Sequence, residues 1–168
     1  MEFAQVQRSE IDELVTFLTG DEWPFHVMRR LDEAAVRARA ASGAYDQAFW
    51  VLDGASRAGL VRLMDLDDGT PLFDLRVRAT ARGRGAGTAA VRWLTAHVFT
   101  HYTTNRIEGT TRQDNLAMRR IFERTGYVKE AHYREAWPSG DGVRDSVGYA
   151  ILRRDWLRGT TTPVIWSS

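Results

Sequence analysis

Residues 72–88 read LFDLRVRATARGRGAGT, an apolar stretch followed by a glycine-rich one. The pattern predicts a strand at Leu72–Val77, a tight turn at residues 82–87 and a helix that begins at Thr88. A glycine-rich turn exposes backbone N–H groups, and a helix N-terminus adds free donors and the positive end of its dipole. Arg82 and Arg84 add positive charge at the same place. We therefore expect this turn to bind the pyrophosphate of a nucleotide-like cofactor.

The composition is typical of one globular domain. The chain has 168 residues, of which 43% are hydrophobic and 27% charged, so residues 1–168 should form a single domain with its own core. The net charge of +1 gives no reason to expect a nucleic-acid partner. The absence of Cys, together with only four scattered His, predicts no disulfide, no cysteine nucleophile and no metal site.

The N-terminal residues, MEFAQVQRSEIDE, lack the basic region and apolar core of a signal peptide. No apolar run in the sequence is long enough to span a bilayer. We therefore expect a cytoplasmic protein without a membrane partner.

Apolar periodicity and turn residues predict the other elements. The expected strands are residues 3–6, 48–52, 58–66, 106–111, 127–137 and 143–152. The expected helices are residues 11–20 after an N-cap at Ser9, 33–41 after an N-cap at Asp32, 88–102, and 115–125 ended by Gly126. The last two strands should form a hairpin around residues 139–142. The strands on either side of the third helix should run parallel, because a crossover helix joins them.

Two segments outside these elements are unusual. Residues 21–26, DEWPFH, combine acids, aromatics, a proline and a histidine in a loop, which is typical of a docking site. The alternative is an aromatic anchor between two helices. Residues 160–166, TTTPVIW, form an apolar tail that could pack on a sheet edge or on a second subunit.

The two commonest nucleotide motifs do not fit the glycine turn. The dinucleotide fingerprint needs G-x-G-x-x-G after the first strand, whereas these glycines have another spacing and follow the fourth strand. A Walker loop needs Gly-Lys-Ser/Thr, and the only Lys in the chain is Lys129. The pattern that remains is Arg-x-x-Gly-x-Gly, formed by Arg82, Gly85 and Gly87.

The sequence resembles the GNAT (GCN5-related N-acetyltransferase) superfamily over nearly its whole length. The resemblance rests on the element order β-α-α-β-β-β-α-β-α-β-β, on residues 82–87, and on residues 115–127, NLAMRRIFERTGY, which are similar to the family's N-x-x-A/S…E-x-x-G-F/Y. The segment from Arg134 to Trp156 resembles the RimJ/RimL-type ribosomal-protein N-terminal acetyltransferases. The resemblance implies an α/β (α+β) fold whose mixed, mostly antiparallel sheet has a splayed central parallel strand pair flanked by helices.

The resemblance also implies acetyl-CoA as the co-substrate. The glycine turn would bind its pyrophosphate, the strand before the turn and Asn115 its pantetheine arm, and Arg119 or Arg120 its phosphates. The alternative is that Asn115 is a helix N-cap and the arginines form a solvated helix face. The expected cofactor-binding residues are Leu75, Val77, Arg82, Gly83, Arg84, Gly85, Gly87, Thr88, Asn115, Arg119 and Phe122.

The sequence indicates the catalytic residues less clearly than the cofactor-binding residues. Glu108, Asp74 and Glu22 are candidate bases for an amine acceptor, although Glu108 and Asp74 could equally form structural ion pairs. Many family members carry a Tyr that protonates the leaving thiolate where this chain has Phe122, so no general acid is predicted. This departure favours an alternative function, a non-catalytic acyl-CoA-binding sensor or partner module.

Four further residues are candidates for acceptor binding: Trp23, Phe25, His26 and Arg112. Arg112 could bind an acidic acceptor, or it could pair with Asp114 or Glu108. The implied acceptor is a protein N-terminus or a small amine such as an antibiotic or polyamine. A homodimer is the expected assembly, and tRNA-directed acetylation would need a more basic chain.

Overall fold

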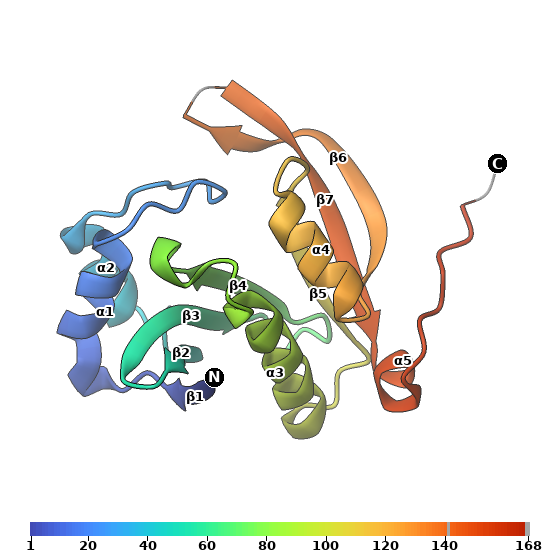
Figure 1. The fold of residues 1–168 in the computed structure, drawn as a ribbon, viewed down its shortest axis with the longest axis horizontal. Helices are drawn as coiled ribbons and strands as arrows, with labels where there is room; N and C mark the ends of the chain where they lie inside the picture. The colour runs from blue at the N-terminus through green and yellow to red at the C-terminus, as the bar shows by residue number, and fades with distance from the viewer. Residues whose placement is uncertain (141, 167–168) are drawn as a thin grey trace. The chain divides into compact units, whose positions relative to one another are not determined.

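Figure 1 shows the chain in the computed structural model, which describes residues 1–140 and 142–166. Asp141, at the predicted hairpin turn, lies outside the described residues. The elements in chain order are β1 (Glu2–Gln5), the 3₁₀ turn η1 (Arg8–Glu10), α1 (Ile11–Thr19), α2 (Glu33–Ala41), β2 (Ala48–Asp53), β3 (Ser56–Met64), β4 (Leu72–Val77), the 3₁₀ turn η2 (Ala79–Ala81), α3 (Ala86–His101), β5 (Arg106–Arg112), α4 (Leu116–Arg124), β6 (Val128–Ser139), β7 (Gly142–Leu152) and α5 (Arg153–Arg158).

The strands form a seven-stranded mixed sheet in the order β1-β2-β3-β4-β5-β7-β6. Antiparallel ladders join β1 to β2, β2 to β3, β5 to β7 and β6 to β7. Strands β4 and β5 run parallel, and their ladder pairs Leu72 with Glu108. The predicted fold class, with a mostly antiparallel sheet and a parallel strand pair, is therefore confirmed.

The chain folds as two compact units, and it passes from one to the other within β3, β4 and α3. Unit 1 comprises Met1–Leu63 and Asp74–Ala90, and unit 2 comprises Met64–Phe73 and Val91–Ser168. Each unit has its own buried aromatic residues.

The core of unit 1 joins α1 and α2 to β2 and β3. Phe17 of α1 stacks on Trp23, with ring centroids 5.5 Å apart, and meets the edge of Trp50 at 5.4 Å. Helix α2 begins at the predicted N-cap, where Asp32 Oδ1 accepts a hydrogen bond from Ala35 N at 2.8 Å. Its Val36 is fully buried in the same core.

The core of unit 2 contains the buried stripe of α3 and an aromatic cluster. Phe122 of α4 is 1% exposed and stacks on Tyr149 of β7, with centroids 4.7 Å apart and ring planes 9° apart. Phe73 and Tyr127 pack against the other sides of Phe122. A Cβ at Gly109 of β5 would lie 2.6 Å from Phe122 Cζ, so this glycine makes room for the aromatic ring.

Two local predictions were wrong, and one helix was not predicted. Helix α3 begins at Ala86 rather than Thr88, because the left-handed residues that close the turn end at Gly85. Ser9 is not an N-cap but lies within η1, where Gln7 N donates to Glu10 Oε2 at 2.9 Å. Helix α5 was not predicted; Arg153 at its start donates to the carbonyls of Phe99, Tyr102 and Thr104, contacts that local sequence does not reveal.

Candidate functional site

The glycine turn of unit 1 connects β4 to α3 through η2. Gly83 and Gly85 have φ angles of +74° and +88°, in the left-handed region that favours glycine. No heavy atom of the described chain lies within 4 Å of a Cβ placed at either glycine, so the space beside the backbone is open. Gly85 is followed directly by the first turn of α3, whose N–H groups at residues 86–88 have no partner inside the helix. This combination of exposed donors and helix dipole suits a phosphate.

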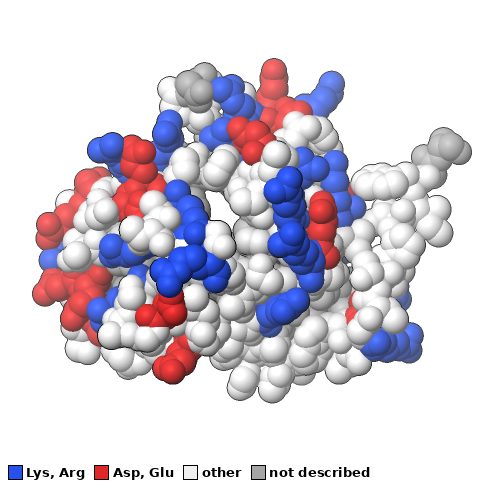
Figure 2. All heavy atoms as spheres, viewed as in Figure 1, with Lys and Arg blue, Asp and Glu red and all other residues white. Residues whose placement is uncertain are grey.

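Two arginines surround this turn. Arg82 Nε donates to the Val77 carbonyl at 3.1 Å and its Nη2 donates to the Glu22 carbonyl at 3.1 Å. Arg84 pairs with Asp53 at 3.3 Å. Both side chains are exposed, and Figure 2 shows Lys and Arg side chains gathered over the segment that follows β4. The predicted positive charge is therefore present at the turn.

The loop between α1 and α2 is tied to this part of unit 1. Asp21 Oδ2 accepts a hydrogen bond from Ala79 N at 2.9 Å, beside the glycine turn. His26 Nε2 and Asp74 Oδ1 of β4 lie 2.9 Å apart. The structure thus brings His26 to Asp74 and Arg82 to the Glu22 carbonyl, two contacts between predicted residues that the sequence could not place beside one another.

Asp74 is held in its ionised form. Its Oδ1 faces His26 and its Oδ2 lies 3.2 Å from Arg76 Nε. Burial, the largest single influence, raises the pKa of Asp74, but the His26 hydrogen bond and the charges of Arg76 and Arg62 outweigh it and hold the pKa well below its usual range. Arg76 was missed by the sequence reasoning; the signal was its position two residues after Asp74, which places both side chains on one face of the strand.

The loop aromatics have different surroundings. Trp23 is 1% exposed in the core of unit 1, and its Nε1 donates to the Leu18 carbonyl at 2.9 Å. It therefore anchors the loop, as the alternative reading of this segment expected. Phe25 is half-buried, and Glu22 is exposed and pairs with Arg30 at 2.6 Å.

The candidate residues on β5 of unit 2 are both in ion pairs. Glu108 pairs with Arg106, which also contacts Glu130 of β6 at 2.8 Å. Arg112 Nη2 donates to Asp114 Oδ2 at 2.6 Å and its Nε donates to Asp114 Oδ1 at 2.9 Å, a bidentate pair. This bond lowers the pKa of Asp114. The structural alternative raised for each residue is thus present, with Arg106 as the partner of Glu108.

The predicted residue Asn115 lies at the N-terminus of α4 in unit 2. Asn115 Oδ1 accepts from Met118 N at 3.2 Å, and its Nδ2 donates to Thr111 Oγ1 at 3.0 Å. Asn115 is therefore the N-cap of α4. Arg119 on the next turn donates to the Gln113 carbonyl at 3.0 Å and to the Tyr149 hydroxyl at 3.3 Å. In Figure 2 the basic side chains of this helix stand out over α4.

A comparison with protein families finds a match that includes the glycine turn and helix α3. The family model described as "Acetyltransferase (GNAT) domain" matches residues 2–128. The chain belongs to the GNAT acetyltransferase family. The predicted family is therefore confirmed.

Individual relatives of this GNAT domain are distant. The "Putative ribosomal N-acetyltransferase YdaF" of Bacillus subtilis is 28% identical over 108 residues, which cover 63% of this chain and 59% of that protein, less than two thirds of its length. The crystal structure of the spermidine N-acetyltransferase from Vibrio cholerae in complex with CoA and spermine has a TM-score of 0.79 at 16% identity, covering 93% of this chain and 97% of that one. A GNAT-family acetyltransferase from Bacillus anthracis has a TM-score of 0.77 at 15% identity, with 90% and 94% covered. These two structures show the same fold.

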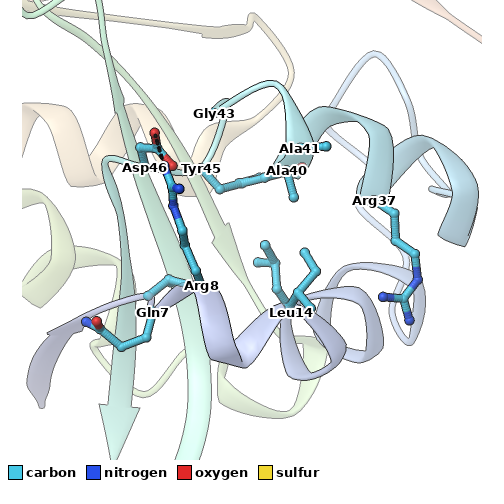
Figure 3. Close-up of a pocket in the computed structure, with 11 residues that line it drawn as sticks. Gln7, Arg8, Leu14, Arg37, Ala40, Ala41, Gly43, Tyr45 and Asp46 are labelled. Carbon is cyan, nitrogen blue, oxygen red and sulfur yellow. Dashed lines mark ion pairs between the residues drawn. The ribbon is translucent and has the colours of Figure 1, made fainter.

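A separate hollow in unit 1 contains none of the predicted site residues. It has a volume of about 350 Å³ and is lined by α1, α2 and the segments on either side of them. Figure 3 shows the ion pair between Arg8 and Asp46, 3.6 Å long, at one side of this hollow. In the part of the GNAT domain that the structure describes, no helix combines the length and apolar character needed to cross a bilayer.

Proposed function

We propose that this GNAT domain transfers the acetyl group of acetyl-CoA directly to a primary amine in a ternary complex. The observation that carries the proposal is the glycine turn: two left-handed glycines with open space beside them, directly before the N-terminus of α3. A side chain at either position would fill open space beside the turn. The turn therefore fits a pyrophosphate, and the family match makes acetyl-CoA its source.

In unit 1, the residues proposed to hold acetyl-CoA are the backbone of residues 83–88 and of Leu75 and Val77, with Arg82 and Arg84 adding charge. In unit 2 they are Asn115 and Arg119, whose present hydrogen bonds would be shared with or exchanged for the cofactor. We infer that residues 1–168 act as one domain, because the family match spans parts of both units.

Bound acetyl-CoA would supply the activated thioester, and the protein must supply a deprotonated amine. Asp74 is a poor base because its pKa is depressed. Glu22 is exposed and paired with Arg30. Glu108 is also paired, with Arg106, but it lies within β5, where the resemblance to the family places a Glu that could act through a water. We propose Glu108 as the base.

Phe122 cannot provide the proton for the leaving thiolate. It is 1% exposed among other aromatic rings, so its position is structural. This observation favours the second candidate function, an acyl-CoA-binding module without turnover. If the enzyme is active, the thiolate leaves unaided or with a proton from water; a thiol pKa of about 8.5 makes thiolate a tolerable leaving group near neutral pH.

Release of the CoA thiol in the presence of amines separates the two functions. The chain contains no Cys, so a thiol reagent reports only CoA. We expect turnover with a peptide or small amine, and a lower kcat with an unchanged acetyl-CoA KM in Glu108→Gln. Binding of CoA without turnover on any amine would support the sensor. Unchanged activity of Glu108→Gln at every pH would exclude Glu108 as the base.

The proposed assembly is a homodimer. Its support is the apolar end of the chain, where Ile165 is 92% exposed and Trp166 is 66% exposed. Exposed aromatic and aliphatic side chains next to each other are typical of contact surfaces.

A further inference from the structure

Unit 1 offers three carboxylates to an acceptor, and all three are already engaged. Asp21 accepts hydrogen bonds from the backbone N–H groups of Glu22 at 2.8 Å and Ala79 at 2.9 Å. Glu22 pairs with Arg30, and Asp74 is held between His26 and Arg76. A polyamine or an aminoglycoside carries several ammonium groups, and each would need a carboxylate that is not already paired.

The cations beside Asp74 outnumber the acids. Arg76 is 9% exposed, its guanidinium lies 5.3 Å from the centre of the Trp23 ring, and its Nε contacts Asp74. Arg62 of β3 is close enough to depress the pKa of the same carboxyl group. Arg76 is thus the guanidinium that contacts Asp74, and Arg62, which donates to the Ala44 carbonyl, adds positive charge at a longer distance.

Arg76 also has an unused donor. Its Nη1 is buried and has no hydrogen-bond partner among the described residues. A buried N–H of a charged group that lacks an acceptor is costly, and a carboxylate oxygen is the partner that it binds most strongly. His26 adds no such donor, because its Nε2–H donates to Asp74 and the Nδ1 atom of a neutral imidazole is then an acceptor. The buried Nη1 of Arg76 is thus suited to a ligand that brings oxygen acceptors with negative charge.

We propose that Arg76, positioned by Asp74 beside His26, selects acceptor amines that carry a carboxylate close to the reacting nitrogen and rejects polycations. An acceptor of this class is a peptide N-terminus followed by acidic residues, or a small amino acid with an acidic side chain. The inference rests on the acetyl transfer proposed above and adds the chemical class of the acceptor. Asp74 acts here as the residue that positions His26 and Arg76, not as the group that binds the ammonium.

The test compares acceptors of matched size by thiol release from acetyl-CoA. The panel contains the amidated tripeptides Ser-Asp-Glu, Ser-Ala-Ala and Ser-Lys-Lys, free aspartate, and spermidine. We expect kcat/KM to be about tenfold higher for the acidic peptide than for the alanine peptide, and lowest for spermidine. The preference should shrink with added salt, because it is electrostatic. Free aspartate distinguishes a small acceptor from a peptide.

Variants of Asp74 and Arg76 test whether these residues cause the preference for the acidic peptide. Asp74→Asn keeps the shape of the side chain but leaves Arg76 without its carboxylate, so the ratio of acidic to alanine peptide should rise. Arg76→Met removes the charge, so the same ratio should fall towards one. Asp46→Asn is the matched control, because Asp46 pairs with exposed Arg8 on a different surface of unit 1, and the ratio should stay at the wild-type value.

The outcomes separate the two proposals. Faster turnover of spermidine or of the lysine peptide would overturn the acceptor class and leave acetyl transfer standing. A loss of activity in Asp74→Asn that is greatest for spermidine would also overturn it, because Asp74 would then bind the ammonium. Lack of turnover with every amine, despite CoA binding, would overturn the proposed function as well. If Arg76→Met fails to fold, the Asp74→Asn result decides.

Discussion

The negative charge of one residue, Asp74, is stabilised by its neighbours in unit 1. It accepts from His26 and Arg76, and its pKa is depressed in the folded chain. A depressed carboxyl pKa stabilises the folded state at pH values above the unfolded pKa of about 3.9. That contribution is lost as the pH falls through the folded value.

We expect the free energy of unfolding of the wild type to exceed that of Asp74→Asn above about pH 5. The difference should diminish below about pH 4, because the unfolded carboxyl group then binds a proton and the folded one must follow. Urea unfolding of both proteins between pH 3 and pH 7 measures it. A difference that grows on acidification would contradict the depressed pKa.

Gly109 tests the packing of the aromatic cluster in unit 2. A Cβ at this position would lie 2.6 Å from Phe122 Cζ and 3.0 Å from Phe73 Cε1. Gly109→Ala should therefore destabilise the protein by about 1–3 kcal/mol through overpacking. Gly140→Ala is the control, because no heavy atom of the described chain lies within 4 Å of its Cβ position. Equal urea midpoints for the two variants would mean that the ring does not fill this space.

For a single element, the turn between β4 and α3, the cost of backbone strain can be measured separately from the effect on CoA binding. Gly85 and Gly69 have φ angles of +88° and +83°, and neither has a heavy atom of the described chain within 4 Å of a Cβ. A Val at either position should cost at least about 1 kcal/mol, because the left-handed region disfavours a Cβ. Only the Gly85 side chain would occupy the proposed pyrophosphate site.

Thermal unfolding with and without CoA distinguishes the two variants. At a CoA concentration of about 100 Kd the wild type should gain about 2.7 kcal/mol of stability. Gly69→Val should be destabilised but keep this gain, and Gly85→Val should lose it. A full CoA-induced shift in Gly85→Val would remove the turn from the binding site.

At the scale of the whole chain, the tail provides a test of assembly. Asp155 accepts hydrogen bonds from Thr162 N and Thr162 Oγ1, both at 2.8 Å, so the start of the tail is fixed to unit 2. Beyond it, Ile165 and Trp166 are exposed. Deletion of residues 163–168 should keep the bonds to Asp155 and remove the proposed dimer contact.

We expect the full chain to sediment as a dimer whose Tm rises with protein concentration, since association stabilises the folded state. The shortened chain should sediment as a monomer with a Tm that does not depend on concentration. Identical sedimentation of both chains would contradict the role of the tail.

The local sequence correctly predicted those structural features that depend only on residues close together in the chain. The bounds of β4, the N-caps at Asp32 and Asn115 and the glycine turn follow from apolar alternation, cap residues and left-handed positions. Helix α5, with six residues, depends on the distant carbonyls that Arg153 contacts. Trp23 could not be assigned to the core from a loop sequence, because burial depends on how α1 and β2 pack around it.

The same limit applies to the candidate site. His26 and Asp74 are 48 positions apart, so no sequence spacing indicated their contact. Ion pairing of Glu108 was foreseen as an alternative to catalysis, but its partner Arg106 was not identified. Residue types thus indicated the chemistry, and the tertiary structure showed which groups are already engaged.

We propose above all that the turn after β4 binds the pyrophosphate of acetyl-CoA. Amide hydrogen exchange at residues 83–88, measured with CoA and with pantetheine, tests it most directly. CoA should slow exchange at these amides, because its phosphate oxygens accept their hydrogen bonds, and pantetheine, which lacks the pyrophosphate, should not. Unchanged exchange at residues 83–88 in the presence of saturating CoA would contradict the account.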